Sequence, residues 1–169
     1  PIFNKMSEVE IKEYQFFLLI EQLKYVYRNS VYYREKFDEA HINIANIKSF
    51  DDYFKLPLFL DKEKERLSQQ ESREKLGHPF GMHLASSPDE IAFTGTTSGT
   101  SGQPTFTYTF TRKDLNLMNQ FISHMLSYGR IMKGERVFFG HALGIYATTS
   151  IVDGIKHHGA LPIDVDIRT

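Results

Sequence analysis

Hydrophobic residues near the start of the chain recur every three or four positions, which is the spacing of one face of an α-helix. The repeating residues are Phe16, Ile20, Leu23 and Tyr27. Ser7 precedes them with a glutamate three positions later, the arrangement of a capping box. The pattern predicts a long helix from about Glu8 to Arg28. After the break at Asn29-Ser30, the segment VYYREKFDEA predicts a second, shorter helix.

A short turn, an extended segment and a charged helix are expected next. Asp51 and Asp52 are expected to begin the turn, and LPLFL is expected to be extended because Pro57 disfavours helix in the residue before it. Asp61 is the expected N-cap of the helix KEKERLSQQESREKL, whose mixed charges are typical of a solvated surface. The residues from Gly77 to Pro88 predict a loop.

Strand and helix signals alternate in the second half of the chain. The segments EIAFTG, TFTYTF, RVFF and ALPIDVDI predict strands. Thr111 is expected to begin a helix that ends near Gly129, and another helix is expected from about Ala147 to His157, closed by Gly159. The expected apolar face of the first of these helices is Leu115, Met118, Ile122, Met125 and Leu126. This order predicts an α/β fold with parallel pairing of strands across the helices.

Composition and charge argue against several classes of partner. The chain has 169 residues, enough for one domain with a core. Its formal net charge of −1 gives no electrostatic reason to expect nucleic acid or an anionic membrane. The longest apolar run, FFLLI, is too short to cross a bilayer, and there is no cysteine, which suits a reducing compartment. We therefore expect a cytoplasmic protein with no nucleic-acid or membrane partner.

An uncharged segment rich in glycine and hydroxyl groups, FTGTTSGTSGQPTFTY, lies between the first two expected strands. It does not fit a Walker loop, because Gly102 is followed by Gln103, nor a dinucleotide fingerprint, because a strand rather than a helix follows. Gly99 and Gly102 still permit close approach of backbone amides to an anion, and the neighbouring hydroxyls can donate hydrogen bonds. Composition alone favours a polar hairpin loop without a ligand. The order of the residues must decide between a loop without a ligand and an anion-binding loop.

The order TSGTSGQPT, residues 97–105, resembles the phosphate-binding signature of the adenylate-forming enzymes. Other segments narrow the resemblance to the phenylacetate–coenzyme A ligases. These segments are LKYVYRNSVYYREKFDEAHI, IKSFDDYFKLPLFLDKE, HPFGMHLA, FTRKDL, GERVFFGHALGIY and HHGALPIDV. They follow one register from about Leu23 to Val165, which is most of this chain but only the N-terminal part of such enzymes.

The resemblance implies a fold class. The chain is expected to be the N-terminal part of the large domain of an adenylate-forming enzyme, with a helical N-terminus followed by alternating strands and helices. Residues 1–169 would form a single incomplete domain, mainly helical at 1–90 and α/β with the phosphate loop at 91–169. The C-terminal half would lie outside this chain, with the catalytic lysine and the residues that hold adenine and ribose. No catalytic residue is therefore assigned, and the chain alone is expected to be inactive.

The resemblance also implies binding residues. The phosphate loop would be Thr97, Ser98, Gly99, Thr100, Ser101, Gly102 and Gln103, with Gln103 where many relatives have lysine. The acyl pocket would include His141, Leu143 and Tyr146. Alternatively, His141 is a hydrogen-bonded histidine at a strand end and Tyr146 a packed aromatic. No metal-binding residues are expected, because the adjacent His157 and His158 point about 100° apart on a helix and read as a solvated helix end.

The implied activity is that of an ATP-dependent carboxylic acid–coenzyme A ligase, which forms an acyl-adenylate and then a thioester. ATP, Mg²⁺ and coenzyme A are the implied substrates and cofactors, and the partner would be a small-molecule carboxylic acid of aryl or arylacetic type. Two alternatives stay open: an acyl-protein synthetase or other adenylating enzyme that does not use coenzyme A, and a non-catalytic nucleotide-binding module. Exposed apolar surface is expected to make this chain a homo-oligomer.

Overall fold

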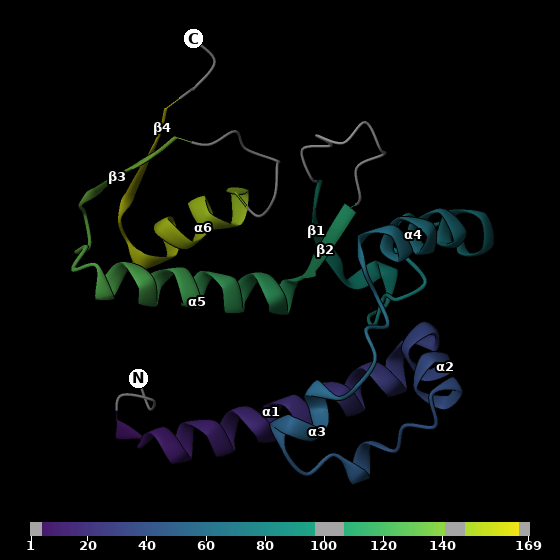
Figure 1. Ribbon diagram of the computed structural model, residues 1–169. Coiled ribbons are helices and arrows are strands. Elements are labelled where there is room, and N and C mark those ends of the chain that lie inside the picture. Colours follow the sequence, from purple (N-terminus) through teal and green to yellow (C-terminus); the bar gives the residue numbers. More distant parts are fainter. Residues whose placement is uncertain (1–4, 97–106, 141–147, 166–169) are drawn as a thin grey trace. The chain divides into compact units, whose positions relative to one another are not determined.

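The structure is a computed structural model. It describes residues 5–96, 107–140 and 148–165, apart from the side chain of Asp164 (Figure 1). The chain divides into two units, one ending at Ser86 and the other beginning at Ser87, and each has its own hydrophobic core. Within these ranges, every helix is too short or too polar to cross a membrane.

The first unit begins with two helices that share one serine. Helix α1 spans Glu8–Asn29 and α2 spans Val31–Glu39. The backbone N–H of Ser30 donates to the carbonyl of Val26 at the end of α1, and its side chain accepts from the N–H of Tyr33 at the start of α2. Ser30 is fully buried. The predicted break is therefore confirmed, and a single buried side chain fixes it.

The α1 start follows the predicted capping box. The Ser7 hydroxyl accepts from the N–H of Glu10 at 3.3 Å, and the Ser7 N–H donates to the Glu10 carboxylate at 2.7 Å. The Ser7 N–H first, and then the Ser7 hydroxyl, which donates to the Glu10 carboxylate at 2.8 Å, hold the pKa of Glu10 below its usual range. Local sequence alone therefore determines where α1 begins.

Two short helices follow α2. The 3-10 helix η2 spans Ile44–Asn46, and α3 spans Phe50–Phe54. The cap of α3 is Ser49, whose hydroxyl accepts from the N–H of Asp52 at 3.2 Å. The expectation that Asp51 and Asp52 begin this turn was therefore wrong by a residue or two. They lie in its first turn, where negative charge is favourable.

The core of the first unit is aromatic and aliphatic. Leu23, Phe37 and Ile47 are buried. The ring centroid of Phe37 lies 6.1 Å from that of Tyr27 on α1 and 5.2 Å from that of Phe59. The apolar residues packed around this cluster are Phe16, Leu19, Ile20, Tyr27, Ile42, Ile44, Tyr53, Leu56 and Phe59. The predicted apolar stripe of α1 thus faces the core.

Helix α4 spans Lys62–Leu76, as predicted, and Asp61 caps it by accepting from the N–H groups of Glu63 and Lys64. It is not wholly a solvated surface helix, which corrects the prediction, because three of its polar residues, Ser68, Gln69 and Ser72, are buried. The Ser72 hydroxyl donates to the carbonyl of His78 at 2.7 Å and accepts from the N–H of Gly81 at 3.0 Å. These contacts hold the following loop against α4.

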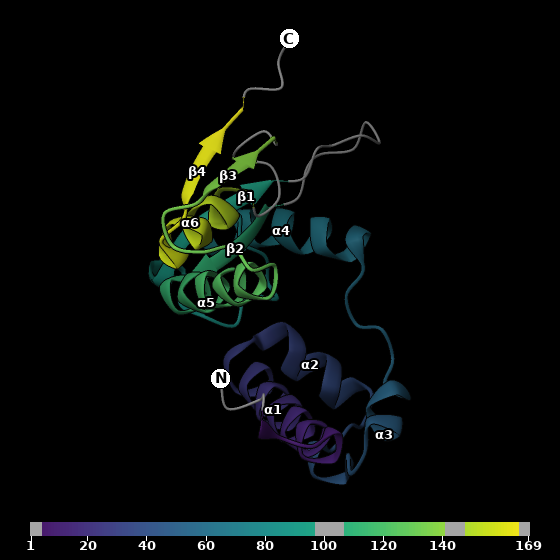
Figure 2. The same ribbon diagram turned by 90° about the vertical axis from the view of Figure 1, so that its left-hand side faces the viewer.

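The second unit has the predicted order of strands and helices (Figures 1 and 2). After the 3-10 helix η3, Pro88–Glu90, strands β1, Ile91–Thr96, and β2, Thr107–Thr111, pair in antiparallel fashion. Helix α5 spans Arg112–Tyr128, β3 spans Arg136–Phe139, α6 spans Thr148–His158 and β4 spans Leu161–Asp164. β3 and β4 pair in parallel. Parallel pairing is thus confirmed across α6 but was wrong across α5, because β2 pairs with β1 and not with β3 in the described part of the chain.

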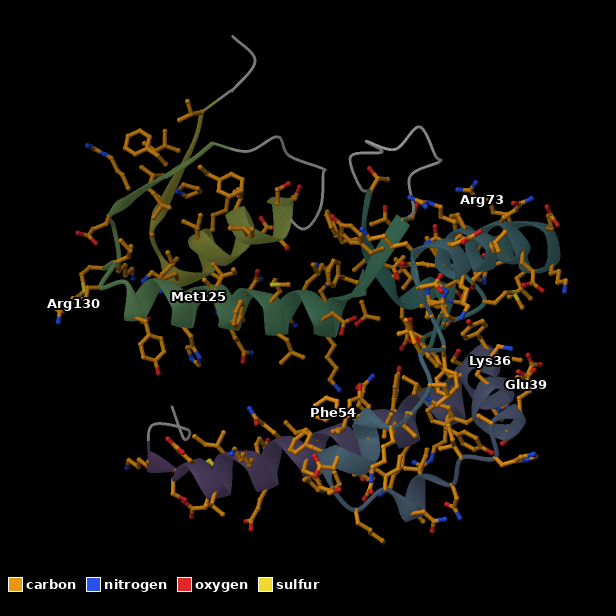
Figure 3. All side chains as sticks on the ribbon, in the orientation of Figure 1. Lys36, Glu39, Phe54, Arg73, Met125 and Arg130 are labelled. Carbon is orange, nitrogen blue, oxygen red and sulfur yellow. The ribbon has the colours of Figure 1, made fainter. Side chains whose placement is uncertain are left out.

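Helices α5 and α6 pack closely over the β3–β4 pair. The buried core here is Ile122, Phe139, Ile155 and Ala160. A Cβ added at Gly154 of α6 would lie only 2.5 Å from the Cβ of Ile122 on α5, so only glycine permits this approach. One predicted core residue of α5 was wrong: Met125, labelled in Figure 3, is 55% exposed. The buried face instead runs through Met118, Ile122 and Leu126.

Candidate functional site

The predicted phosphate loop lies at the open end of the β1–β2 hairpin. Its residues, Thr97, Ser98, Gly99, Thr100, Ser101, Gly102 and Gln103, fall outside the described residues. The register fixes both ends of the loop, because Thr96 pairs directly with Thr107 as the last pair of the ladder. A strand follows the loop, as predicted, so no helix N-terminus is supplied there.

The hairpin is fixed to the rest of the unit. Phe93 and Phe110 are directly opposite in the ladder, with ring centroids 6.0 Å apart, and Tyr108 meets Phe110 edge to face at 5.9 Å. β2 continues into α5 at Thr111, whose hydroxyl accepts from the N–H of Asp114 at 3.2 Å. The Asp114 carboxylate in turn accepts from the Thr111 N–H at 2.8 Å. The predicted capping box is confirmed, and it joins the arm that carries the loop to a long helix.

The predicted acyl-pocket segment follows the carboxyl end of β3. His141, Leu143 and Tyr146 lie within residues 141–147, outside the described residues. The described flanks place this segment between Gly140, just after β3, and Thr148, the first residue of α6. In open α/β proteins, ligands bind beyond the carboxyl ends of parallel strands. The pocket role of His141 therefore stays a prediction, and so does its alternative role as a hydrogen-bonded histidine at a strand end.

The described elements that flank the two candidate segments share one helix. Helix α5 contacts β1, β2 and α6. The two views agree that the β1–β2 hairpin and α6 lie on one side of α5 (Figures 1 and 2).

Sequence reasoning missed a buried amide on that helix. The side-chain oxygen of Asn119 is buried and has no hydrogen-bond partner among the described residues. A buried carbonyl oxygen without a partner costs roughly 1–3 kcal/mol, so such groups call for an explanation. The only signal in the sequence is an amide beside Met118, within the apolar stripe of α5.

The histidine pair at the end of α6 does not form a solvated helix end, which corrects the prediction for His158. Its Nε2 lies 2.9 Å from the carbonyl oxygen of Ile131, and its Nδ1 lies 3.0 Å from the Ser123 hydroxyl. Because a carbonyl can only accept, Nε2 carries the hydrogen. His158 therefore ties α6 to α5 and to the residues after it, while His157 is exposed. No metal-binding group of three or more His, Asp or Glu residues occurs in the described part of the chain.

A second histidine that contacts residues of another element, His83, lies in the first unit. His83 Nδ1 is 2.9 Å from the Ser68 hydroxyl, and Nε2 is 4.0 Å from the Glu65 carboxylate. Burial lowers the pKa of His83 and raises the pKa of Glu65. Both shifts favour the neutral forms. No local pattern indicated a role for His83, because its partners lie on α4.

The relatives found by comparison match most of the chain. No protein-family model matches it. It is 25% identical to the phenylacetate–coenzyme A ligase of Aromatoleum evansii over 143 residues, which is 85% of this chain and 30% of the relative. It is 25% identical to the phenylacetate–coenzyme A ligase of Pseudomonas putida over 136 residues, 80% of this chain and 28% of the relative. The resemblance predicted from the sequence is confirmed.

Solved structures agree on the fold. A crystal structure of 2-hydroxyisobutyryl-CoA ligase in the postadenylation state, in complex with 2-HIB-AMP, matches 96% of this chain and 33% of that chain with a TM-score of 0.83 and 20% identity. The same ligase in the thioesterification state, in complex with 2-HIB-AMP and CoA, matches with a TM-score of 0.82 and 22% identity. The chain has the fold of an acyl-CoA ligase.

The chain matches only part of the length of these ligases. The chain spans about 30% of the curated relatives and 33% of the first solved ligase. Within that span, the predicted fold class is confirmed: a helical N-terminal region is followed by alternating strands and helices. The proteins similar to this chain are CoA ligases, and solved neighbours contain an adenylate together with CoA.

Proposed function

We propose that the whole protein is an ATP-dependent carboxylic acid–coenzyme A ligase. The observation that carries the proposal is the sequence TSGTSGQPT at the open end of a hairpin, in a chain with the acyl-CoA ligase fold. We propose that the two units belong to one incomplete domain, divided into a mainly helical region, 1–90, and an α/β region, 91–169. The other parts of that domain, including the residues for adenine and ribose, would lie outside this chain.

The proposed first step joins the acid to the nucleotide. A carboxylate oxygen of the acid attacks the α-phosphorus of ATP, the bond to the bridging oxygen breaks, and pyrophosphate leaves with its electron pair. The amides of Gly99 and Gly102 and the hydroxyls of Thr97, Ser98, Thr100 and Ser101 would hold the β- and γ-phosphates and offset the charge that develops on the leaving group. In the second step, the thiol of coenzyme A attacks the acyl carbon and AMP leaves.

Mg²⁺ is proposed to arrive with the nucleotide. Phosphate oxygens and water supply most ligands of Mg²⁺ in nucleotide sites, and hydroxyl oxygens of the loop are suitable additional ligands. The ion would neutralise phosphate charge that the neutral Gln103 cannot. The described residues contain no acidic cluster that would bind it independently.

The proposed substrate is an aryl or arylacetic acid. The relatives in Aromatoleum evansii and Pseudomonas putida are phenylacetate–coenzyme A ligases, which supports this class. His141, Leu143 and Tyr146 would line the acyl pocket, and a histidine and a tyrosine there suit an acid with a polar substituent. The solved neighbour is named for a hydroxy acid without an aromatic ring, so small hydroxy acids belong in any test panel.

The proposed setting is cytoplasmic, a reducing compartment that suits a chain without cysteine. Homo-oligomer formation by this chain is proposed from its exposed apolar residues. On the β3–β4 pair, Phe138 is 70% exposed and Leu161 is 53% exposed. Parallel strands normally have both faces covered, so this surface is suited to burial against another polypeptide. Sedimentation of the chain as a monomer at all concentrations would contradict this part of the proposal.

Thioester formation tests the function. The full-length protein is incubated with MgATP, coenzyme A and a panel of acids: phenylacetate, hydroxybenzoates, 2-hydroxyisobutyrate and octanoate. Mass spectrometry then measures AMP and acyl-CoA. AMP and acyl-CoA in equal amounts with an aryl acid is the expected result. Formation of the acyl-adenylate without the thioester would favour the second candidate function, an acyl-protein synthetase that transfers the acyl group to a protein. No adenylate with any acid would support a non-catalytic nucleotide-binding module, which the neutral Gln103 favours.

A further inference from the structure

The first unit carries a groove that the proposed ligase chemistry does not use. It lies between the second half of α1 and the segment that contains η2, and its volume is about 460 Å³. That volume falls within the usual range for small-molecule sites. None of its lining residues belongs to residues 97–106 or 141–147. The groove is therefore a separate candidate site, and its test does not depend on the proposed function.

The floor of the groove is apolar and belongs to a packed core. Ile20 and Tyr27 from α1 meet Ile44 from η2, and all three pack against the cluster that contains the buried Ile47. The Tyr27 hydroxyl donates to the Asp38 carboxylate at 2.9 Å, which fixes the orientation of its ring. A hydrocarbon laid on this floor would lose contact with water on one side and gain packing contacts.

Local hydrogen bonds hold the opposite wall in place. The Asn43 side chain accepts from the N–H of Ala45 at 2.9 Å, and the Asn43 carbonyl accepts from the N–H of Asn46 at 2.9 Å. The N–H of Ile47 donates to the carbonyl of Ile44 at 3.1 Å. The wall is thus built before any ligand arrives, so little ordering cost opposes binding.

The rim of the groove is positively charged. Lys24, Arg28 and Lys48 line it, and no acidic residue does. Lys24 is paired with Glu21 at 2.7 Å. Lys24, with a smaller contribution from Arg28, holds the pKa of Glu21 below its usual range, and the Asp52 carboxylate accepts from the backbone N–H of Lys48 at 3.1 Å. The three cations outnumber these two carboxylates, so the rim keeps a positive charge beside an apolar floor and is complementary to a molecule with one anionic end.

We propose that this groove binds a small organic anion with an apolar body, namely a carboxylate or phosphate attached to a hydrocarbon. The hydrocarbon lies on Ile20, Tyr27 and Ile44, and the anionic group meets Arg28 and Lys48. A neutral amphiphile would gain only the apolar contacts, and an inorganic anion only the charge. Both should therefore bind more weakly than a molecule that combines the two.

Titration of the chain with four probes tests the proposal. Octanoate and octyl phosphate carry both features, while octanol and inorganic phosphate each lack one. Amide shifts measured by NMR and heats measured by calorimetry should show binding of at least one amphiphilic anion, with shifts centred on Ala45 and Ile47. The amphiphile that binds more tightly identifies the anionic group. Equal affinity for octanol, no binding of either amphiphilic anion, or shifts centred elsewhere would overturn the proposal.

Three variants separate the groove from general surface charge. The double substitution Arg28→Gln/Lys48→Gln is expected to weaken binding of the tighter amphiphilic anion by about tenfold or more. Ala45→Phe, which fills the groove and keeps both cations, should abolish the shifts. The matched control Lys5→Gln/Lys12→Gln removes the same charge at exposed positions outside the groove and should leave affinity unchanged. Equal weakening by the control, or full binding by Ala45→Phe with native circular dichroism, would refute the site.

Discussion

The close contact of α5 with α6 can be tested at one glycine. In Gly154→Ala, the new Cβ would lie 2.5 Å from Cβ, 2.7 Å from Cγ2 and 2.9 Å from Cγ1 of Ile122. The Cβ of Ile122 is attached to its backbone, so no rotamer change relieves the shortest contact. Since Gly154, Ile122 and Ile155 are buried, the helices must move apart.

Two opposing effects set the size of the change. Overpacking in a core costs about 1–3 kcal/mol. Replacing glycine by alanine inside a helix stabilises it by about 0.8–1.0 kcal/mol. The steric effect should dominate because the nearest atom cannot rotate away. We therefore expect Gly154→Ala to lower the free energy of unfolding by about 1–2 kcal/mol.

Urea unfolding followed by circular dichroism measures this change. The control is Lys156→Ala, at an exposed position of the same helix, which should change stability by less than about 0.5 kcal/mol. A double-mutant cycle with Ile122→Ala divides the steric cost, because it removes the contacts with Cγ1 and Cγ2 but keeps the contact with Cβ, so it should reduce only part of the cost of Gly154→Ala. If Gly154→Ala stabilises the protein, the helix contact is wrong.

Three further predictions follow from single side chains. Ser72→Ala leaves the buried Gly81 N–H and the half-buried His78 carbonyl without this hydroxyl, so unfolding should become easier by about 1–3 kcal/mol and the Gly81 amide should exchange faster by NMR; unchanged exchange would contradict the contact. Thr111→Ala removes the cap of α5 and should cost about 1 kcal/mol in thermal unfolding, whereas Thr111→Ser should restore most of it. Burial lowers the pKa of His83, so the unfolded chain binds its proton first and stability should fall as pH drops below the ordinary value of 6.5. The raised pKa of Glu65 acts in the opposite direction, so the test uses a Glu65→Gln background. In that background, His83→Gln should flatten the fall of stability with decreasing pH; an unchanged slope of stability against pH would show that His83 does not cause it.

Elements with local signals were predictable from the sequence. The caps at Ser7, Asp61 and Thr111 depend on residues within three positions, and the structure confirms each of them. The parallel pairing of β3 with β4 followed from the order of strand and helix signals. In these places, short-range chemistry and helical or strand periodicity determine the outcome.

Long-range contacts were not predictable in the same way. Ser72 is part of a charged helix and His158 lies beside another histidine, so both resembled surface residues until their partners were known. Met125 fits the apolar spacing of α5 but lies at the edge of the buried face, because periodicity does not say where a helix is covered. The predicted phosphate loop lies outside the described residues, so its role stays a prediction from the sequence signature.

The phosphate-loop assignment is tested most directly by exchange of labelled pyrophosphate into ATP by the full-length protein in the presence of an aryl acid. We predict acid-dependent exchange in the wild type, a loss of at least about 100-fold in Gly102→Val, and near wild-type exchange in the control Thr94→Ala, an exposed residue of β1 outside the loop. Acid-dependent exchange that Gly102→Val leaves unchanged, or no exchange with any acid, would contradict the assignment.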